Sequence, residues 1–146
     1  MDRLVDYEQD LYAWFSQNAT LLREGRLAEI DLVHIADELE DMGISQLRAL
    51  ESRLTVLLMH LLKWQYQPIR RSKSWSNTII EQRKQISKLL KRSPSLQHHL
   101  AESIADAYDS ARRYAETETG LSINTFPEDC PYLWEKFMES DFFPDG

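Results

Sequence analysis

The sequence has little of what marks a secreted, disulfide-linked or membrane protein. It contains a single cysteine, Cys130, which cannot form an internal disulfide and so favours a reducing cytoplasm. The N-terminus lacks the apolar core of a signal peptide. The most apolar run, residues 56–62, is interrupted by His60 and is much shorter than the roughly 20 residues of a membrane span. We therefore expect a cytoplasmic protein without a membrane partner.

Glycine and proline are also scarce, and their scarcity favours long helices. Four glycines and five prolines in 146 residues leave long uninterrupted stretches. Apolar residues recur at three- and four-residue steps along these stretches, and no strand-like alternation competes with this helical period. The length fits one domain. We predict an all-α fold, an up-and-down helical bundle of about four principal helices in a single domain over residues 1–146.

Two helices are predicted in the N-terminal half. Gly25 is a natural C-terminal stop for the first helix, and Asp31 is an N-cap for the second. One apolar face then continues over residues 31–66, through Leu32, Leu39 and the leucines that follow. Gly43 lies inside this run, where it is either tolerated within one long helix or separates two shorter helices.

Two further helices and a tail complete the prediction. Ser72 or Ser74 caps a third helix, and Ser93-Pro94 starts a fourth, which ends near Gly120. The bundle then covers about residues 6–120. The C-terminal tail, about residues 121–146, is aromatic and rich in turn residues, and it docks on its own bundle or on a partner. Its large aromatic residues include Tyr132, Trp134, Phe137, Phe142 and Phe143.

The net charge of −7 hides a basic middle between two acidic flanks. Residues 61–100 carry nine Lys or Arg against one acidic residue, whereas residues 1–60 carry five against twelve and residues 101–146 three against eleven. Either these charges pair or are solvated within the molecule, or the basic segment is a stripe for nucleic-acid phosphates. The pI of about 5.1 disfavours nucleic acid and favours the first interpretation. The basic residues are Lys63, Arg70, Arg71, Lys73, Arg83, Lys84, Lys88, Lys91 and Arg92.

One set of residues suggests a metal site, but helix geometry argues against it. His34, Glu38 and Asp41 share a helical face, and His60 is a tempting fourth ligand. In one continuous helix, Glu38 and His60 are roughly 33 Å apart. A turn at Gly43 still leaves them about 15 Å apart. We predict no metal and no other cofactor.

The richest local cluster lies between His60 and Arg83. A helical hairpin around Pro68 brings a histidine, two tryptophans and several arginines to one end of the bundle. The cluster is either a packed corner, in which arginine stems cover the indoles, or a binding site for a small anion or a partner peptide. The candidate binding residues are His60, Trp64, Arg70, Arg71, Trp75 and Arg83.

Motifs throughout the chain give it a family resemblance. They include Asp10–Trp14, Leu21–Gly25, Glu38–Gly43, His60–Trp64, Gln67–Trp75, Thr78-Ile79, Gln82-Arg83, Ser93–Leu96, Glu118–Leu121, Phe126-Pro127 and Cys130–Tyr132. In this combination the sequence resembles the bacterial domain of unknown function family 29, which is abundant in cyanobacteria. The resemblance implies a compact helical protein of almost the family's full length. It implies no reaction, cofactor or catalytic residue.

These observations favour a non-enzymatic helical protein-interaction module, with a protein partner or self-association. One alternative is a nucleic-acid-linked regulator or antitoxin-like protein that uses the basic segment 61–100. A metal-dependent enzyme is the other alternative, motivated by the histidine–carboxylate clusters. No catalytic residue is predicted.

Overall fold

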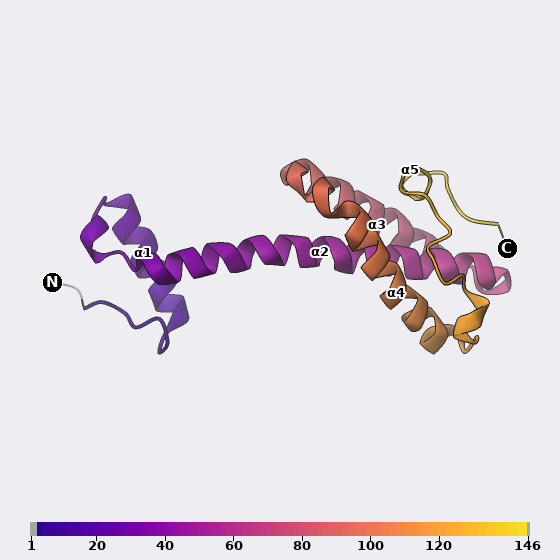
Figure 1. Cartoon of the computed structure of the whole chain (residues 1–146), viewed down its shortest axis with the longest axis horizontal. Helices are drawn as coiled ribbons and strands as arrows, with labels where there is room; N and C mark the ends of the chain where they lie inside the picture. Colours follow the sequence, from indigo (N-terminus) through magenta and orange to yellow (C-terminus); the bar gives the residue numbers. More distant parts are fainter. Residues whose placement is uncertain (1–2, 146) are drawn as a thin grey trace. The chain divides into compact units, whose positions relative to one another are not determined.

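The computed structural model describes residues 3–145, which form helices and loops without a strand. The prediction of an all-α bundle with four principal helices is confirmed (Figure 1). The chain divides into two compact units, residues 1–44 (unit 1) and residues 45–146 (unit 2). The single-domain assignment stays a prediction. The α-helices are α1 (Leu11–Arg23), α2 (Leu32–Tyr66), α3 (Lys73–Arg92), α4 (Leu100–Thr119) and α5 (Trp134–Phe137).

The predicted ends of the first two helices are confirmed. Gly25 follows α1 with a φ of 68°, and the next amide, that of Arg26, donates a hydrogen bond back to the carbonyl of Leu21. The Asp31 carboxylate accepts a hydrogen bond of 3.3 Å from the His34 amide at the start of α2. α2 is continuous through Gly43, so this glycine lies inside one long helix.

The ends of α3 and α4 follow local sequence signals with one correction. Ser72, rather than Ser74, caps α3 by accepting a hydrogen bond of 3.2 Å from the Trp75 amide. Ser93-Pro94 opens a short 3-10 helix, Pro94–His99, and α4 begins only at Leu100. Gly120 ends α4 with a φ of 75°, in the left-handed region that favours glycine.

In unit 2, α2, α3 and α4 pack in an up-and-down arrangement (Figure 1). Lys63, near the end of α2, lies over the ring of Trp75, near the start of α3, at 4.7 Å. Lys63 also pairs with Glu118, near the end of α4, at 3.6 Å. Each helix therefore reverses the direction of the one before it.

A leucine core holds these three helices together. It is completed by aromatic side chains of the C-terminal tail, since Phe126 and Phe137 are as inaccessible as the central leucines. The Tyr132 hydroxyl also donates a 2.6 Å hydrogen bond to the side chain of Gln65 on α2. The tail therefore docks on its own unit. The core contains Leu50, Leu54, Leu57, Leu58, Leu61, Leu62, Ile79, Ile86, Leu90, Ala107, Tyr108, Ala111, Ala115, Phe126, Tyr132 and Phe137.

Unit 1 has a much smaller interior. Among its described residues, 3–44, the buried side chains are Trp14, Asn18 and Leu21 on α1 and Ile30 just before α2. One of these four residues is polar. Among residues 3–145, no helix has both the length and the apolarity required to cross a membrane.

Candidate functional site

Three of the predicted binding residues hold the C-terminal tail. Arg83 is only 6% exposed, and its guanidinium donates hydrogen bonds to the carbonyls of Phe137 (2.7 Å), Ser140 (3.4 Å) and Phe142. Burial lowers the pKa of this guanidinium, because desolvation disfavours its charged form. Backbone carbonyls and the ring of Phe143, 5.3 Å away, take the place of water around the cation.

Arg71 makes the same kind of contact at the end of the tail. It donates hydrogen bonds to the carbonyls of Trp64 (2.7 Å) and Pro144 (3.3 Å), and it lies over the Trp64 ring. The Trp64 ring in turn packs on Phe143 at 4.9 Å. Trp64, Arg71 and Arg83 therefore form a tail clamp, in which the donors of both arginines are directed at the protein's own carbonyls.

The other three predicted residues lie outside the clamp. The His60 ring bonds the Val56 carbonyl through Nδ1 at 2.8 Å, and because a carbonyl only accepts, Nδ1 carries the proton. Burial, with a contribution from Lys63, lowers the pKa of His60. Trp75 covers Lys63, whereas Arg70 is exposed. The assignment of these six residues to a ligand site stays a prediction.

The basic residues of segment 61–100 also fall into two groups, those that contact other parts of the protein and those that are exposed. Arg71 and Arg83 hold the tail, and Lys63 pairs with Glu118. The lysines on the solvent side of α3 are exposed, and no ion pair among residues 3–145 includes them. Within the described part of the chain, Lys63 alone pairs the basic segment with an acidic flank.

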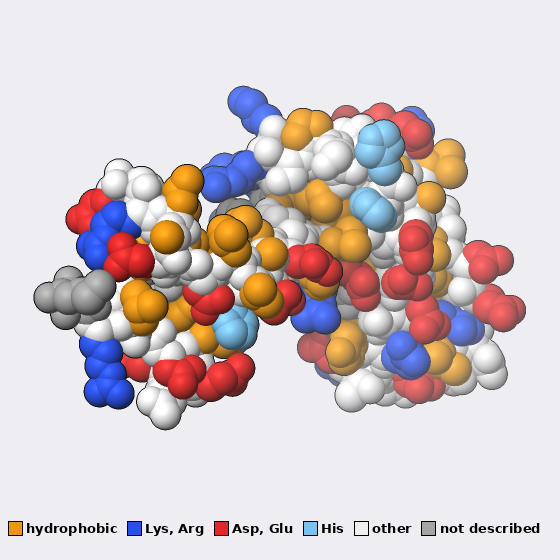
Figure 2. Space-filling view, turned by 60° about the vertical axis from the view of Figure 1, so that its left-hand side comes forward, with side chains coloured by type: hydrophobic (Ala, Val, Ile, Leu, Met, Phe, Trp, Pro, Cys, Tyr) orange, Lys and Arg blue, Asp and Glu red, His pale blue; other side chains and the backbone are white. Residues whose placement is uncertain are grey.

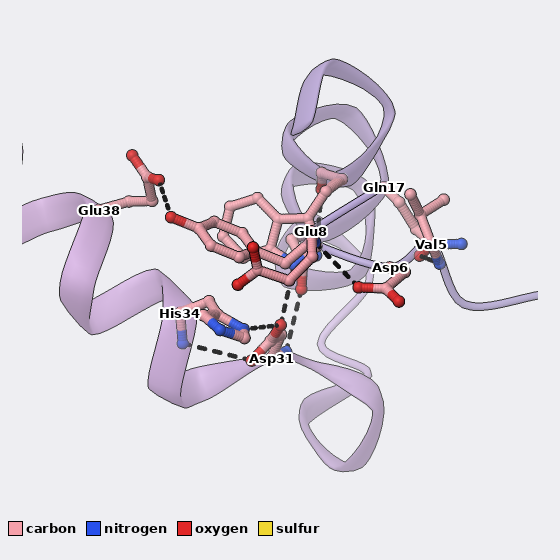
Figure 3. A network of polar contacts seen from close by, with 10 residues as sticks. Val5, Asp6, Glu8, Gln17, Asp31, His34 and Glu38 are labelled. Atoms are coloured by element: carbon pink, nitrogen blue, oxygen red, sulfur yellow. Dashed lines mark hydrogen bonds and ion pairs between the residues drawn. The ribbon is translucent and has the colours of Figure 1, made fainter. Parts of the chain in front are cut away.

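A polar network centred on Asp31 organises unit 1 (Figure 3). Oδ2 of Asp31 accepts hydrogen bonds from the Trp14 indole (2.9 Å) and from Nδ1 of His34 (2.7 Å). The Asp31 amide donates to the Asn18 side chain at 3.0 Å. Indole and imidazole donors therefore converge on the Asp31 carboxylate just before α2, and the Trp14 and Asn18 side chains join Asp31 to α1.

Tyr7 extends this network toward the next turn of α2. Its ring stacks on His34 at 3.9 Å, and its hydroxyl donates a hydrogen bond to Glu38. That hydrogen bond raises the pKa of Tyr7 to about 12, because loss of the proton would place two negative charges side by side. His34 and Glu38 therefore both face Tyr7, and all three side chains are half-buried.

The His34–Asp31 pair shifts both pKa values. The hydrogen bond to Asp31 raises the pKa of His34 above its ordinary value. Burial acts to raise the pKa of Asp31, but hydrogen bonds from His34 and Trp14 outweigh burial and lower it.

The metal site suggested by His34, Glu38, Asp41 and His60 does not form, because His34 contacts Asp31 and Glu38 contacts Tyr7. Among residues 3–145 no three His, Cys, Asp or Glu residues are placed to hold a metal ion.

Because this network occupies the inner side of α2, an apolar side of the same helix is left outside. Leu32 is 67% exposed, Val33 73% and Leu39 63%. At 100° per residue, two neighbouring rows of side chains form this side, each with the spacing i, i+4, i+7 and i+11. We call it the outer face of α2, and all its residues are exposed: Leu32, Ala36, Leu39 and Gly43 in one row, and Val33, Asp37, Glu40 and Ile44 in the other.

Exposed apolar side chains are concentrated in unit 1. Of fifteen large hydrophobic side chains that are exposed among residues 3–145, eleven belong to residues 4–44. Figure 2 shows hydrophobic side chains gathered on unit 1, at the left of the view, with acidic side chains among them. The sequence predicts one apolar face along α2, and in unit 1 this face is exposed at Leu32 and Leu39.

The model of a family described as "Domain of unknown function DUF29" matches residues 7–143, nearly the whole chain. No curated protein and no solved structure matches the chain.

Proposed function

Because the chain belongs to the DUF29 family, whose description names no activity, we propose a function from the geometry of the molecule itself. The protein is a helical interaction module that binds a partner protein through the outer face of α2. The observation that carries this proposal is the inverted arrangement of α2 in unit 1. His34 and Glu38 are half-buried against Asp31 and Tyr7, whereas Leu32 and Leu39 face solvent.

A surface helix of a globular protein ordinarily buries its apolar stripe and exposes its charges. Contact between a leucine-rich stripe and water is unfavourable. When a partner protein covers the stripe, removal of this contact contributes to the free energy of binding. Burying a leucine or valine side chain fully contributes about 1.5–3 kcal/mol, so side chains that are two-thirds exposed each offer about 1–2 kcal/mol to a docking partner. A contiguous exposed apolar surface of this kind marks interaction sites in soluble proteins.

The rest of the molecule supports the role of a scaffold. The aromatic tail, the other candidate interaction element, is packed into the core of unit 2 and held there by Arg71 and Arg83. Hydrogen bonds between Asp31 and the Trp14 and Asn18 side chains hold the start of α2 against α1. These hydrogen bonds support a fixed position for the outer face of α2.

Photo-crosslinking in cells of the native host tests this function. A photo-reactive phenylalanine derivative is placed at Leu39, and the matched control carries it at Ile80, which is 52% exposed on α3. We expect a discrete adduct from position 39 that is absent from position 80. If position 39 gives no adduct, or if both positions give the same adducts, the proposed function is wrong.

A further inference from the structure

The charges on the outer face of α2 indicate the chemistry of the partner. We infer that the partner segment is an amphipathic helix with lysine or arginine beside its apolar face. This inference rests on the proposed function and adds to it the class of partner.

The first row of the outer face has a shape against which a partner helix can pack. Leu32 and Leu39 alternate with the small residues Ala36 and Gly43, so that two ridges are separated by shallow gaps. A Cβ atom built on Gly43 meets nothing within 4 Å, so this gap is open. A partner helix whose apolar residues repeat at three- and four-residue steps can set its side chains into such gaps.

The second row of the outer face determines which charge the partner helix should carry. Asp37 and Glu40 lie between Val33 and Ile44, and neither carboxylate belongs to an ion pair among residues 3–145. A partner that covers the apolar ends of this row also removes water from the two carboxylates. Carboxylates that lose water need cationic or hydrogen-bonding partners. A lysine or arginine at the edge of the docked helix supplies both.

The charge of the whole unit favours the same partner. Residues 1–44 carry three Lys or Arg against eleven Asp or Glu, and residues 31–44 carry five acidic residues and no basic one. A second copy docked face to face would place Asp37 and Glu40 of each chain near those of the other, and like charges across an interface oppose association. A basic helix is attracted by the same field.

Synthetic peptides test the inference with the full-length protein. Two helical peptides of about 18 residues, or five turns, present the same leucines on one face and differ only in flanking lysine or glutamate. A third peptide has the lysine peptide's composition in scrambled order. Fluorescence anisotropy at physiological ionic strength measures the three affinities. We expect the leucine–lysine helix to bind at least about tenfold more tightly than either of the others.

Two double variants separate charge from apolar contact. Asp37→Lys with Glu40→Lys should reverse the preference, so that the leucine–glutamate helix binds more tightly. Leu32→Gln with Leu39→Gln should remove binding of both helices. Ile80→Gln is the control, and it should leave all affinities unchanged.

Three results would overturn the inference. Equal binding of the ordered and scrambled lysine peptides would mean that net charge alone attracts them. An unchanged preference in the Asp37→Lys, Glu40→Lys variant would mean that these carboxylates do not select the partner. If sedimentation shows a dimer and the Leu39→Gln substitution dissociates it, then a second copy of the chain occupies the outer face of α2. If position 39 crosslinks in cells while the peptides show no preference, the interaction function stands and only the basic-helix partner is wrong.

Discussion

Helix α2 contributes to both units, and its apolar stripe has opposite surroundings in the two. In unit 2, Leu50, Leu54, Leu57 and Leu61 are completely inaccessible to solvent. In unit 1, Leu39, on the same stripe, is 63% exposed. The difference lies in the neighbours, because α3, α4 and the tail offer apolar side chains, whereas α1 and the segment before it offer an indole N–H, an amide and a phenol. The buried face of a helix is therefore the one whose side chains form favourable contacts with its neighbours.

The largest expected effect contrasts two leucines on this stripe. Leu57→Ala should lower the free energy of unfolding by about 2–5 kcal/mol, because it leaves a cavity in a packed core. Leu39→Ala should change it by no more than about 0.5 kcal/mol, since the side chain is already exposed. Urea unfolding followed by circular dichroism measures both. Similar losses for the two variants would mean that the outer face of α2 is not free.

The tail clamp is the next test. Arg83→Lys should lower the free energy of unfolding by about 2–4 kcal/mol, because a lysine cannot reach the carbonyls of Phe137, Ser140 and Phe142 together and leaves buried or half-buried acceptors unpaired. The exposed neighbour Lys84 provides the control, and Lys84→Ala should stay within about 0.5 kcal/mol of the wild type. Tryptophan fluorescence during denaturation reports both. A stable Arg83→Lys protein would show that packing alone holds the tail.

Gly43→Ala should stabilise the protein by a smaller amount. The added methyl group meets no atom within 4 Å, and alanine is favoured over glycine inside a helix by about 0.5–1 kcal/mol. Thermal unfolding should therefore show a higher midpoint. A lower midpoint would mean that α2 needs the flexibility of glycine at this position.

The smallest effects concern pH and again contrast the two units. The pKa of His34 is raised by Asp31, so the stability that this pair adds is complete below the ordinary histidine pKa and is lost as pH rises through the folded-state value. Because the pKa of Asp31 is lowered, the stability that the pair adds is also lost as pH falls through the folded-state pKa of Asp31. Burial lowers the pKa of His60, so His60 costs stability as pH falls through its ordinary value.

Nuclear magnetic resonance titration of the two imidazole rings checks these directions. His34 should titrate at a higher pH than His60. Asp31→Asn is the matched variant, and it should lower the pKa of His34 while leaving that of His60 unchanged. The reverse order of the two rings would contradict the assigned hydrogen bonds.

Local signals made most of the helix ends predictable. Gly25, Asp31, Ser72 and Gly120 act through their own backbone or through a residue a few positions away, so the sequence alone reveals them. The start of α4 predicted from Ser93-Pro94 is too early, because residues Pro94–His99 first form a 3-10 helix.

Which face of a helix is buried is not a local property. The stripe from Leu32 to Leu61 has one period throughout, and only the partners of α2 distinguish its two parts. Asp31 and His34 are close in sequence, but Trp14 and Tyr7, which complete the network, are 17 and 27 residues away from Asp31 and His34 respectively. Arg83 was expected in a binding corner, whereas its acceptors are tail carbonyls 54 to 59 residues along the chain.

The accessibility of position 39 tests the central claim most directly. In a Cys130→Ser background, Leu39→Cys and the buried control Ile30→Cys are labelled with a maleimide, first in the purified protein and then in cells of the native host. The account predicts rapid labelling of position 39 in the purified protein, slow labelling of position 30, and protection of position 39 in cells. Slow labelling of position 39 in dilute purified protein would contradict the exposed outer face of α2, and equally rapid labelling in cells would contradict its role as a docking surface.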